Sequence, residues 1–286
     1  MTISADKRLL VPTSLSEALV ALKAHGRDGA PLAGATWISR APFRGEERRP
    51  VYVCIARIEA LRAIEVNDGE LRFGACATHA ALAAFLEPYP EFRGLRQAAA
   101  NSANPAVRNM ATVGGNLCTA DFPAADLVPA LLCFEAEVEL QSGADKAERM
   151  TMSDFLTERA HLSAGTLLTQ IAVRRKPRRS AHVRLPLRKA GDYPVAIVSV
   201  SCPEGEAPRI AIGSVEPTAR RWHGLEEKLG GGPLDSQAAA QAAAEMATDL
   251  SARDGVEAPG WYRLQVLPAL LRRAMQEINQ SGQPRP

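Results

Sequence analysis

Residues 108–126 read Arg-Asn-Met-Ala-Thr-Val-Gly-Gly-Asn-Leu-Cys-Thr-Ala-Asp-Phe-Pro-Ala-Ala-Asp, and the rest of the chain is interpreted around this stretch. Adjacent Gly114 and Gly115 remove two Cβ atoms, so we expect the backbone to turn tightly and approach a ligand closely. Exposed N–H groups in such a turn form a concavity suited to a phosphate or pyrophosphate. Thr112 and Asn116 add a hydroxyl and an amide beside it. The alternative is an ordinary Gly-Gly turn between a helix and a strand.

A second loop of small residues lies earlier in the chain and reads Leu32-Ala33-Gly34-Ala35-Thr36-Trp37. We expect the two loops to converge on the two phosphates of a dinucleotide. Asp126, ten residues past Asn116, is an acceptor-only side chain of the type that holds ribose hydroxyls or orients a ring. The chain has neither a Gly-x-Gly-x-x-Gly fingerprint nor a P-loop, so a dinucleotide here would not lie on a Rossmann unit.

The order and separation of the two loops resemble those of the FAD-binding medium subunit of molybdenum hydroxylases, the family of carbon monoxide dehydrogenase and xanthine dehydrogenase. That family's first loop usually reads Ala-Gly-Gly-Thr-Asp, and its second reads Thr-Ile-Gly-Gly-Asn followed by Pro-x-x-Asp. The matching residues here are 33–37, 112–116 and 123–126. The resemblance covers nearly the whole chain. It implies that both loops, with Leu32 and Asp126, bind FAD.

Two further segments resemble the family and add candidate binding residues. In relatives, the second leucine of a Leu-Leu-Thr strand packs on the cofactor, which implies this role for Leu168. The aromatic residue after Gly-Asp covers the isoalloxazine and controls access to it, which implies this role for Tyr193. A basic residue just upstream contacts the cofactor, for which Lys189 and Arg184 both qualify. Without the resemblance, Leu168 and Tyr193 would be interpreted as core residues.

The chain departs from the family's pattern at three positions. Ala35 stands where relatives usually have glycine, so the local backbone must tolerate a Cβ atom. Trp37 replaces a small or acidic residue and adds bulk beside the flavin that the resemblance implies. The segment between the second loop and Asp126 is one residue longer than usual, with Phe122 as the additional residue.

The resemblance implies an α+β fold in two domains. Residues 1–176 would form a two-part FAD-binding domain of the vanillyl-alcohol-oxidase or PCMH type, divided near residue 60, and residues 177–286 an antiparallel sheet with helices. Local patterns agree with this organisation: Ser14 or Thr13 as cap, with Glu17, predicts the start of a helix, and the Asn-Asp-Gly turn at 67–69 predicts a hairpin. Thr78 is expected to cap a helix that begins at His79, a predicted surface residue. The basic run at 174–179 is expected to be a solvated linker, with a subunit contact or attraction for a phosphorylated acceptor as alternatives.

Composition excludes several classes of protein. The 286 residues are 46% hydrophobic and 23% charged, as in a soluble globular protein. A net charge of +2 and an aromatic content of 5% argue against nucleic-acid binding. No run of apolar residues is long enough to span a membrane or forms a signal peptide, so we expect a cytoplasmic protein. Five cysteines without a Cys-x-x-Cys pair predict neither a zinc site nor an Fe–S cluster, and no metal ligands are expected.

The family resemblance implies a function divided among subunits. Electrons would leave a molybdopterin centre in a large subunit, pass through 2Fe-2S clusters in a small subunit, and reach FAD here before an external small-molecule acceptor. The complex would be a dimer of heterotrimers, and this chain would supply no catalytic residue for substrate oxidation. The alternatives are a self-contained flavoprotein oxidoreductase of the same superfamily and a noncatalytic nucleotide-binding module.

Overall fold

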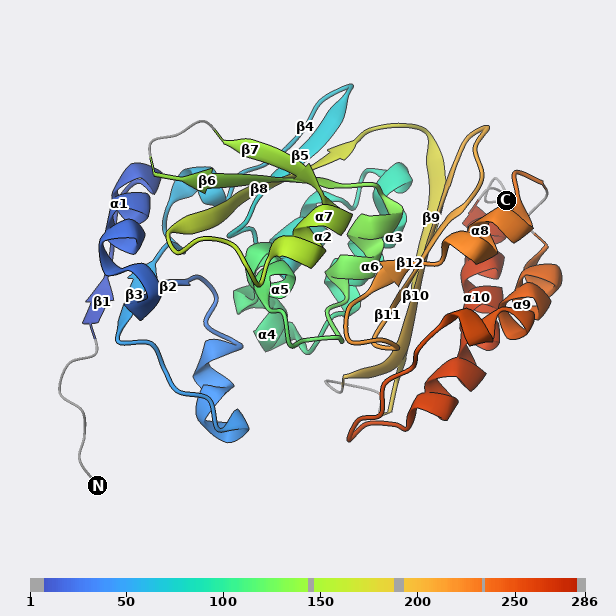
Figure 1. The fold of residues 1–286 in the computed structure, drawn as a ribbon. Coiled ribbons are helices and arrows are strands. Elements are labelled where there is room, and N and C mark those ends of the chain that lie inside the picture. The colour runs from blue at the N-terminus through green and yellow to red at the C-terminus, as the bar shows by residue number, and fades with distance from the viewer. Residues whose placement is uncertain (1–7, 144–146, 188–192, 233–234, 282–286) are drawn as a thin grey trace.

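The computed structural model describes residues 8–143, 147–187, 193–232 and 235–281. Its strands form three sheets, and most of its helices lie between or beside them (Figure 1). The α-helices are α1 (Leu15–His25), α2 (His79–Phe85), α3 (Arg93–Asn101), α4 (Pro105–Met110), α5 (Val113–Cys118), α6 (Leu127–Cys133), α7 (Met152–Glu158), α8 (His223–Leu229), α9 (Ser236–Glu245) and α10 (Gly260–Ser281). None of the helices in the described part of the chain is long and apolar enough to cross a membrane.

The first sheet is parallel, in the order β1 (Arg8–Leu10), β3 (Val51–Cys54), β2 (Gly29–Leu32). Helix α1 packs against it. The helix begins as its sequence predicts: the Ser14 hydroxyl accepts a hydrogen bond from the Glu17 N–H at 3.2 Å, and the Glu17 carboxylate accepts one from the Thr13 N–H at 2.8 Å. Ala18, Leu19 and Leu22 then fall on one face and are buried. The first small-residue loop follows directly from β2.

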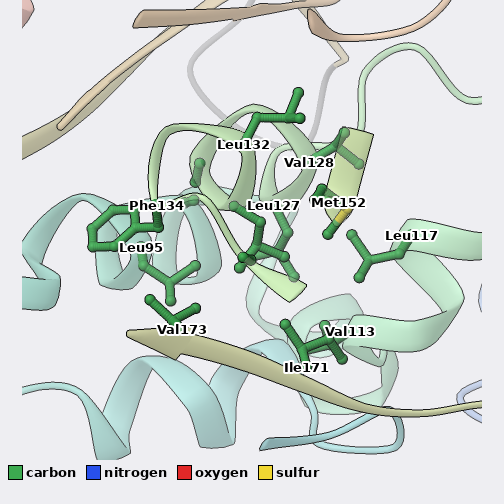
Figure 2. Close-up of a cluster of buried hydrophobic side chains, with 14 of the residues drawn as sticks. Leu95, Val113, Leu117, Leu127, Val128, Leu132, Phe134, Met152, Ile171 and Val173 are labelled. Atoms are coloured by element: carbon green, nitrogen blue, oxygen red, sulfur yellow. The ribbon is translucent and has the colours of Figure 1, made fainter. Parts of the chain in front are cut away.

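The second sheet is antiparallel, in the order β4 (Ile64–Val66), β5 (Glu70–Gly74), β8 (Thr166–Arg174), β6 (Glu137–Ser142), β7 (Glu148–Thr151). The predicted hairpin is β4 and β5, whose turn is held by the Asn67 side chain accepting the N–H groups of Gly69 and Glu70. Below the sheet, side chains of α3, α5, α6 and β8 point toward one another in the main core (Figure 2). The second small-residue stretch is therefore anchored in the largest apolar cluster.

The third sheet is also antiparallel, in the order β12 (Arg220–Arg221), β11 (Arg209–Gly213), β10 (Pro194–Pro203), β9 (Arg178–Pro186). Helix α10 packs on it, and α3 and α6 also contact its strands, so this sheet joins the two halves of the chain (Figure 1). Every residue of β10 is buried. An unbroken run of small and apolar residues in β10 follows from burial on both faces of the sheet.

The basic run at 174–179 is not a solvated linker, and that prediction is wrong. Strand β8 ends at Arg174 and β9 begins at Arg178, so only three residues connect two sheets. Arg178 is 7% exposed and its guanidinium carbon lies 4.7 Å from the centroid of the Phe134 ring. Arg175 forms an ion pair with Glu91 at 2.8 Å. The long side chains bury their stems and find carboxylate or aromatic partners, which charge counting along the sequence does not foresee.

Candidate functional site

A cleft of about 1150 Å³ opens between the first sheet, helices α4 and α5, and the start of the third sheet. This volume is at the upper end for small-molecule sites and suits an elongated ligand. All of the predicted binding residues line it except two: Leu32, which is the last residue of β2, and Lys189, which lies outside the described residues. The predicted residues in the lining are Ala33, Gly34, Ala35, Thr36, Trp37, Thr112, Gly114, Gly115, Asn116, Asp126, Leu168 and Tyr193.

The first loop lines the cleft and carries backbone N–H groups that are not used within the protein. The N–H groups of residues 34–37 have no hydrogen-bond acceptor among the described residues. The loop turns because Ala35 adopts a left-handed conformation with φ of 57°. Its carbonyl then accepts the Ser39 N–H at 2.9 Å. Consecutive unpaired N–H groups around a left-handed residue form a concavity that binds anions.

Gly34 is required by contact between the two loops. A Cβ atom built on it would lie 1.7 Å from the carbonyl oxygen of Met110, which immediately precedes the second stretch. No rotamer relieves this overlap, because the obstacle is backbone. The glycine therefore allows two segments far apart in sequence to pack directly on each other, as the sequence predicted for the pair of loops.

The second stretch is not the tight turn with exposed N–H groups that the sequence predicted. Residues from Val113 onward form α5, and the Thr112 hydroxyl caps it by accepting the Gly115 N–H at 3.2 Å. The Gly114 N–H donates to the Ala75 carbonyl at 2.7 Å, and the Asn116 N–H donates to the Thr112 carbonyl at 3.0 Å. These donors are used within the protein and leave no anion concavity here.

Two residues of this stretch, Gly114 and Asn116, remain important for the cleft. Gly114 is needed for packing, because a Cβ atom there would lie 2.8 Å from the Ala75 Cβ atom. The Asn116 Oδ1 atom is buried and has no hydrogen-bond partner among the described residues. A buried amide oxygen without a donor is costly, so it marks a place where a ligand donor would be stabilised.

Asp126 connects the first two sheets to the third. It lies just before α6 and is 4% exposed. Its Oδ1 atom lies 3.0 Å from Arg184 Nε and 3.3 Å from His182 Nε2. His182 Nδ1 lies 2.8 Å from the Ser199 hydroxyl. Both basic partners come from β9, so the carboxylate links the segment before α6 to β9. This arrangement gives Asp126 a structural role that its sequence position did not predict.

The cleft is electropositive. Among the described residues, five arginines line it against a single carboxylate, that of Asp126; the arginines are Arg27, Arg40, Arg49, Arg159 and Arg184. Arg159 is held by the carbonyl oxygens of Leu117 at 2.5 Å and Ala120 at 3.3 Å, and burial lowers the pKa of its guanidinium. Clustered guanidinium groups favour phosphate ligands. Arg184 was a candidate from the sequence, whereas the other four arginines were missed because each stands alone, without a motif.

Three aromatic side chains from separate segments meet at the cleft. We call Trp37, Phe122 and Tyr193 the aromatic bridge. The Trp37 and Phe122 ring centroids are 4.9 Å apart, and those of Phe122 and Tyr193 are 5.1 Å apart in an edge-to-face arrangement. The Arg44 guanidinium carbon lies 3.8 Å from the centroid of the Trp37 ring. Each such aromatic pair stabilises by about 0.5–1.5 kcal/mol beyond area burial, so the bridge is a defined structure.

His79 is buried and not a surface residue, so that prediction is wrong. Thr78 caps α2 as expected, but His79 is 3% exposed and its Nδ1 lies 2.5 Å from the Ser102 hydroxyl. Burial lowers the pKa of His79 to about 4, so the ring is neutral at pH 7. The first turn of α2 faces the protein because its backbone pairs with Ala111, a long-range contact that local sequence does not encode.

Comparisons with known proteins bear on this cleft directly. A family model described as "FAD binding domain in molybdopterin dehydrogenase" matches residues 5–175, and "CO dehydrogenase flavoprotein C-terminal domain" matches residues 181–278. The chain is 29% identical over 287 residues to the 6-hydroxypseudooxynicotine dehydrogenase complex subunit alpha of Paenarthrobacter nicotinovorans, covering 96% of this chain and 95% of that protein. It is 25% identical over 256 residues to the xanthine dehydrogenase FAD-binding subunit of Escherichia coli O157:H7, covering 86% and 87%.

Solved structures give the same result for the fold. A chain of reconstituted CO dehydrogenase from Oligotropha carboxidovorans superposes with a TM-score of 0.86 at 26% identity, covering 98% of this chain and all of that one. A chain of quinoline 2-oxidoreductase from Pseudomonas putida 86 superposes with a TM-score of 0.85 at 25% identity, covering 98% and 99%.

Proposed function

The chain belongs to the family of FAD-binding medium subunits of the molybdenum hydroxylases, and on that premise we propose that it binds FAD in this cleft and passes electrons to an external acceptor. Membership confirms three predictions made from the sequence: the family itself, the α+β fold with an FAD-binding part and a C-terminal part, and an oxidoreductase component whose cofactor is FAD. When bound, the flavin supplies the electron-transfer chemistry.

The unpaired N–H groups of the first loop, in an electropositive cleft, are the observation that carries the proposed binding mode. The unpaired N–H groups of residues 34–37 would receive the pyrophosphate, and the arginines of the lining would balance its charge. Among these, Arg27, Arg40 and Arg49 form no ion pair with another described residue. One guanidinium nitrogen of Arg49 donates to the Arg27 carbonyl at 3.1 Å, and the remaining donors can reach phosphate oxygens. Thr112 and the buried Asn116 amide line the same cleft and complete the polar contacts.

Leu168 and Tyr193 would hold the isoalloxazine end of the ligand. Both residues line the cleft, from β8 and from the segment before β10 respectively. Leu168 is buried and offers an apolar face, whereas Tyr193 is 37% exposed and faces the opening. Asp126 acts here through Arg184, which it orients toward the same end of the cleft.

The domain limits predicted from sequence, 1–176 and 177–286 with a division near residue 60, stay a proposal. The three sheets support it, because their strands occupy residues 8–54, 64–174 and 178–221 in turn. The partners are a molybdopterin-binding large subunit and a 2Fe-2S small subunit, assembled as a dimer of heterotrimers in the cytoplasm. Support for partners comes from relatives named as medium chains and complex subunits, such as the glyceraldehyde dehydrogenase medium chain of Sulfolobus acidocaldarius.

Titration of the purified apo chain with FAD, followed by flavin fluorescence, tests the binding mode. Arg40→Gln should weaken FAD binding by about tenfold or more, since a charge-assisted hydrogen bond contributes about 1.5–3 kcal/mol. The control is Arg57→Gln, a change at an exposed arginine outside the cleft lining, which should bind as the parent does. Stoichiometric FAD binding by the parent with an unchanged dissociation constant in Arg40→Gln would remove Arg40 from the site.

Copurification of large and small subunits with the tagged chain tests the partners. A self-contained flavoprotein oxidoreductase, the alternative function, would instead oxidise a substrate alone.

A further inference from the structure

Ser214 connects two segments of the cleft that are far apart in the sequence. It follows β11 directly, is fully buried, and does not itself line the cleft. Its N–H donates to the Pro123 carbonyl at 2.9 Å, and its hydroxyl donates to the Pro194 carbonyl at 2.5 Å. Pro123 immediately precedes the lining residue Ala124. Pro194 immediately follows the lining residue Tyr193, so one serine holds both segments.

The backbone of Ser214 is in a conformation that favours glycine. Its φ is 62°, in the left-handed region, where a residue with a Cβ atom is strained. Such residues persist where their surroundings over-determine them, and they gather at active sites and ligand-binding sites. Glycine would adopt this backbone without strain but would lack the hydroxyl. Pro186, opposite Pro194 in β9, has no N–H to donate, so the hydroxyl supplies a donor that this strand pair lacks.

Two arginines hold the carbonyl of Ser214. Arg263, a fully buried residue of α10, donates to it from Nη1 at 2.9 Å, and Arg253 donates to it from Nε at 3.2 Å. The same Nη1 atom of Arg263 donates to the Val195 carbonyl at 2.6 Å, one residue past Pro194. The N–H, the hydroxyl and the carbonyl of Ser214 are therefore all hydrogen-bonded, and α10 helps to fix the residue that connects the two cleft segments.

We propose that Ser214 is a positioning residue for FAD, which sets the separation of the cleft segments that contain Ala124 and Tyr193 and so determines how tightly the cofactor is held. The inference rests on the proposed function, because it requires FAD in this cleft. A ligand binds more tightly to a site that is already in its bound geometry, since no free energy is spent on ordering it. Without the hydroxyl, the segment at Tyr193 would have to be ordered again each time FAD binds.

The test uses the full chain and measures two quantities for each variant. These are the dissociation constant for FAD, from a fluorescence titration, and the urea midpoint of the apo chain. Ser214→Gly removes the hydroxyl but relieves the backbone, so its urea midpoint should stay near the parental value. Ser214→Ala removes the hydroxyl and keeps the strain, so its midpoint should be lower. Both variants should raise the dissociation constant by about fivefold or more, because the affinity depends on the hydroxyl.

Ser201→Ala is the matched control. Ser201 is also a fully buried serine of the third sheet, but its hydroxyl has no hydrogen-bond partner among the described residues, and it does not line the cleft. Its dissociation constant for FAD should equal that of the parent.

Parental affinity in Ser214→Gly would overturn the inference, because weak binding in Ser214→Ala alone would then follow from lost stability. A Ser214→Gly chain that does not fold would overturn it as well, since the role of the serine would then be structural. If only Ser214→Ala fails to fold, Ser214→Gly decides the test by the same criterion. A parent that binds no FAD would instead contradict the proposed function.

Discussion

Gly34→Ala separates the packing role of the first loop from its ligand-binding role. The added Cβ atom would lie 1.7 Å from the Met110 carbonyl oxygen and 2.7 Å from its carbon, whereas Cβ atoms do not approach other heavy atoms below 3.0 Å. The two loops must therefore move apart by at least 1.3 Å, which brings the separation from 1.7 Å to the limit of 3.0 Å. Both sides of the contact are backbone, so side-chain rotation gives no relief.

The expected cost is at the upper end for overpacking, about 3 kcal/mol. For a chain of this size, that corresponds to a fall in melting temperature of about 5–10 °C. The melting temperature is measured by circular dichroism on the apo chain, and FAD affinity by fluorescence titration. We expect FAD binding to be lost as well, because residues 34–37 line the cleft with unpaired N–H groups and the loop that carries them would be displaced.

Gly231→Ala provides the control for this substitution. A Cβ atom at Gly231 would meet nothing within 4 Å, so the same chemical change adds no overlap. If Gly34→Ala has the same melting temperature as Gly231→Ala and retains FAD, direct packing between the loops does not hold the cleft in shape. The account of Gly34 is then refuted.

Three further predictions each concern the contribution of one residue to stability. Ala35→Gly should raise the free energy of unfolding by up to about 1 kcal/mol in urea denaturation, because φ of 57° strains alanine but not glycine. The pKa of His79 falls from 6.5 to about 4 on folding, so the unfolded chain binds its proton first as pH falls. The contribution of neutral His79 to the free energy of unfolding is complete above pH 6.5 and should fall by about 3 kcal/mol as the pH is lowered toward 4. The free energy of unfolding of His79→Gln should decline less steeply over the same range. Asp126→Asn should lower the free energy of unfolding by about 3 kcal/mol, since it removes the largely buried ion pair between Asp126 and Arg184; the exposed Asp68→Asn is its control, and equal urea midpoints for the two would exclude the ion pair.

Family, cofactor and most secondary structure could be predicted from the sequence because their signals are local. A hydroxyl cap followed by Glu17 starts α1, and a turn formed by Asn67 closes the β4–β5 hairpin, each within a few residues. The two small-residue loops were also located correctly at the cleft. Glycine and capping residues act on their own backbone, so their effect is readable without knowledge of distant neighbours.

What the sequence left open was which groups the tertiary fold uses internally and which it leaves for a ligand. The N–H groups around Gly114 were expected at the ligand, but Ala75 and Thr112 accept them, and the unpaired donors lie in the first loop instead. Asp126 was expected at the cofactor, and β9 supplies Arg184 as its partner.

The resemblance of the two loops and the later motifs to a known family gave the fold class and the FAD-binding family before the structure was considered. Helix starts and the hairpin could be predicted from the residues themselves, because capping and turn residues act over short distances along the chain. Only the tertiary structure decided that five scattered arginines share one cleft, that His79 is buried and neutral, and that Trp37, Phe122 and Tyr193 form one bridge. Charge, burial and ring contact depend on separations in space, and three sheets bring together residues that the chain keeps far apart.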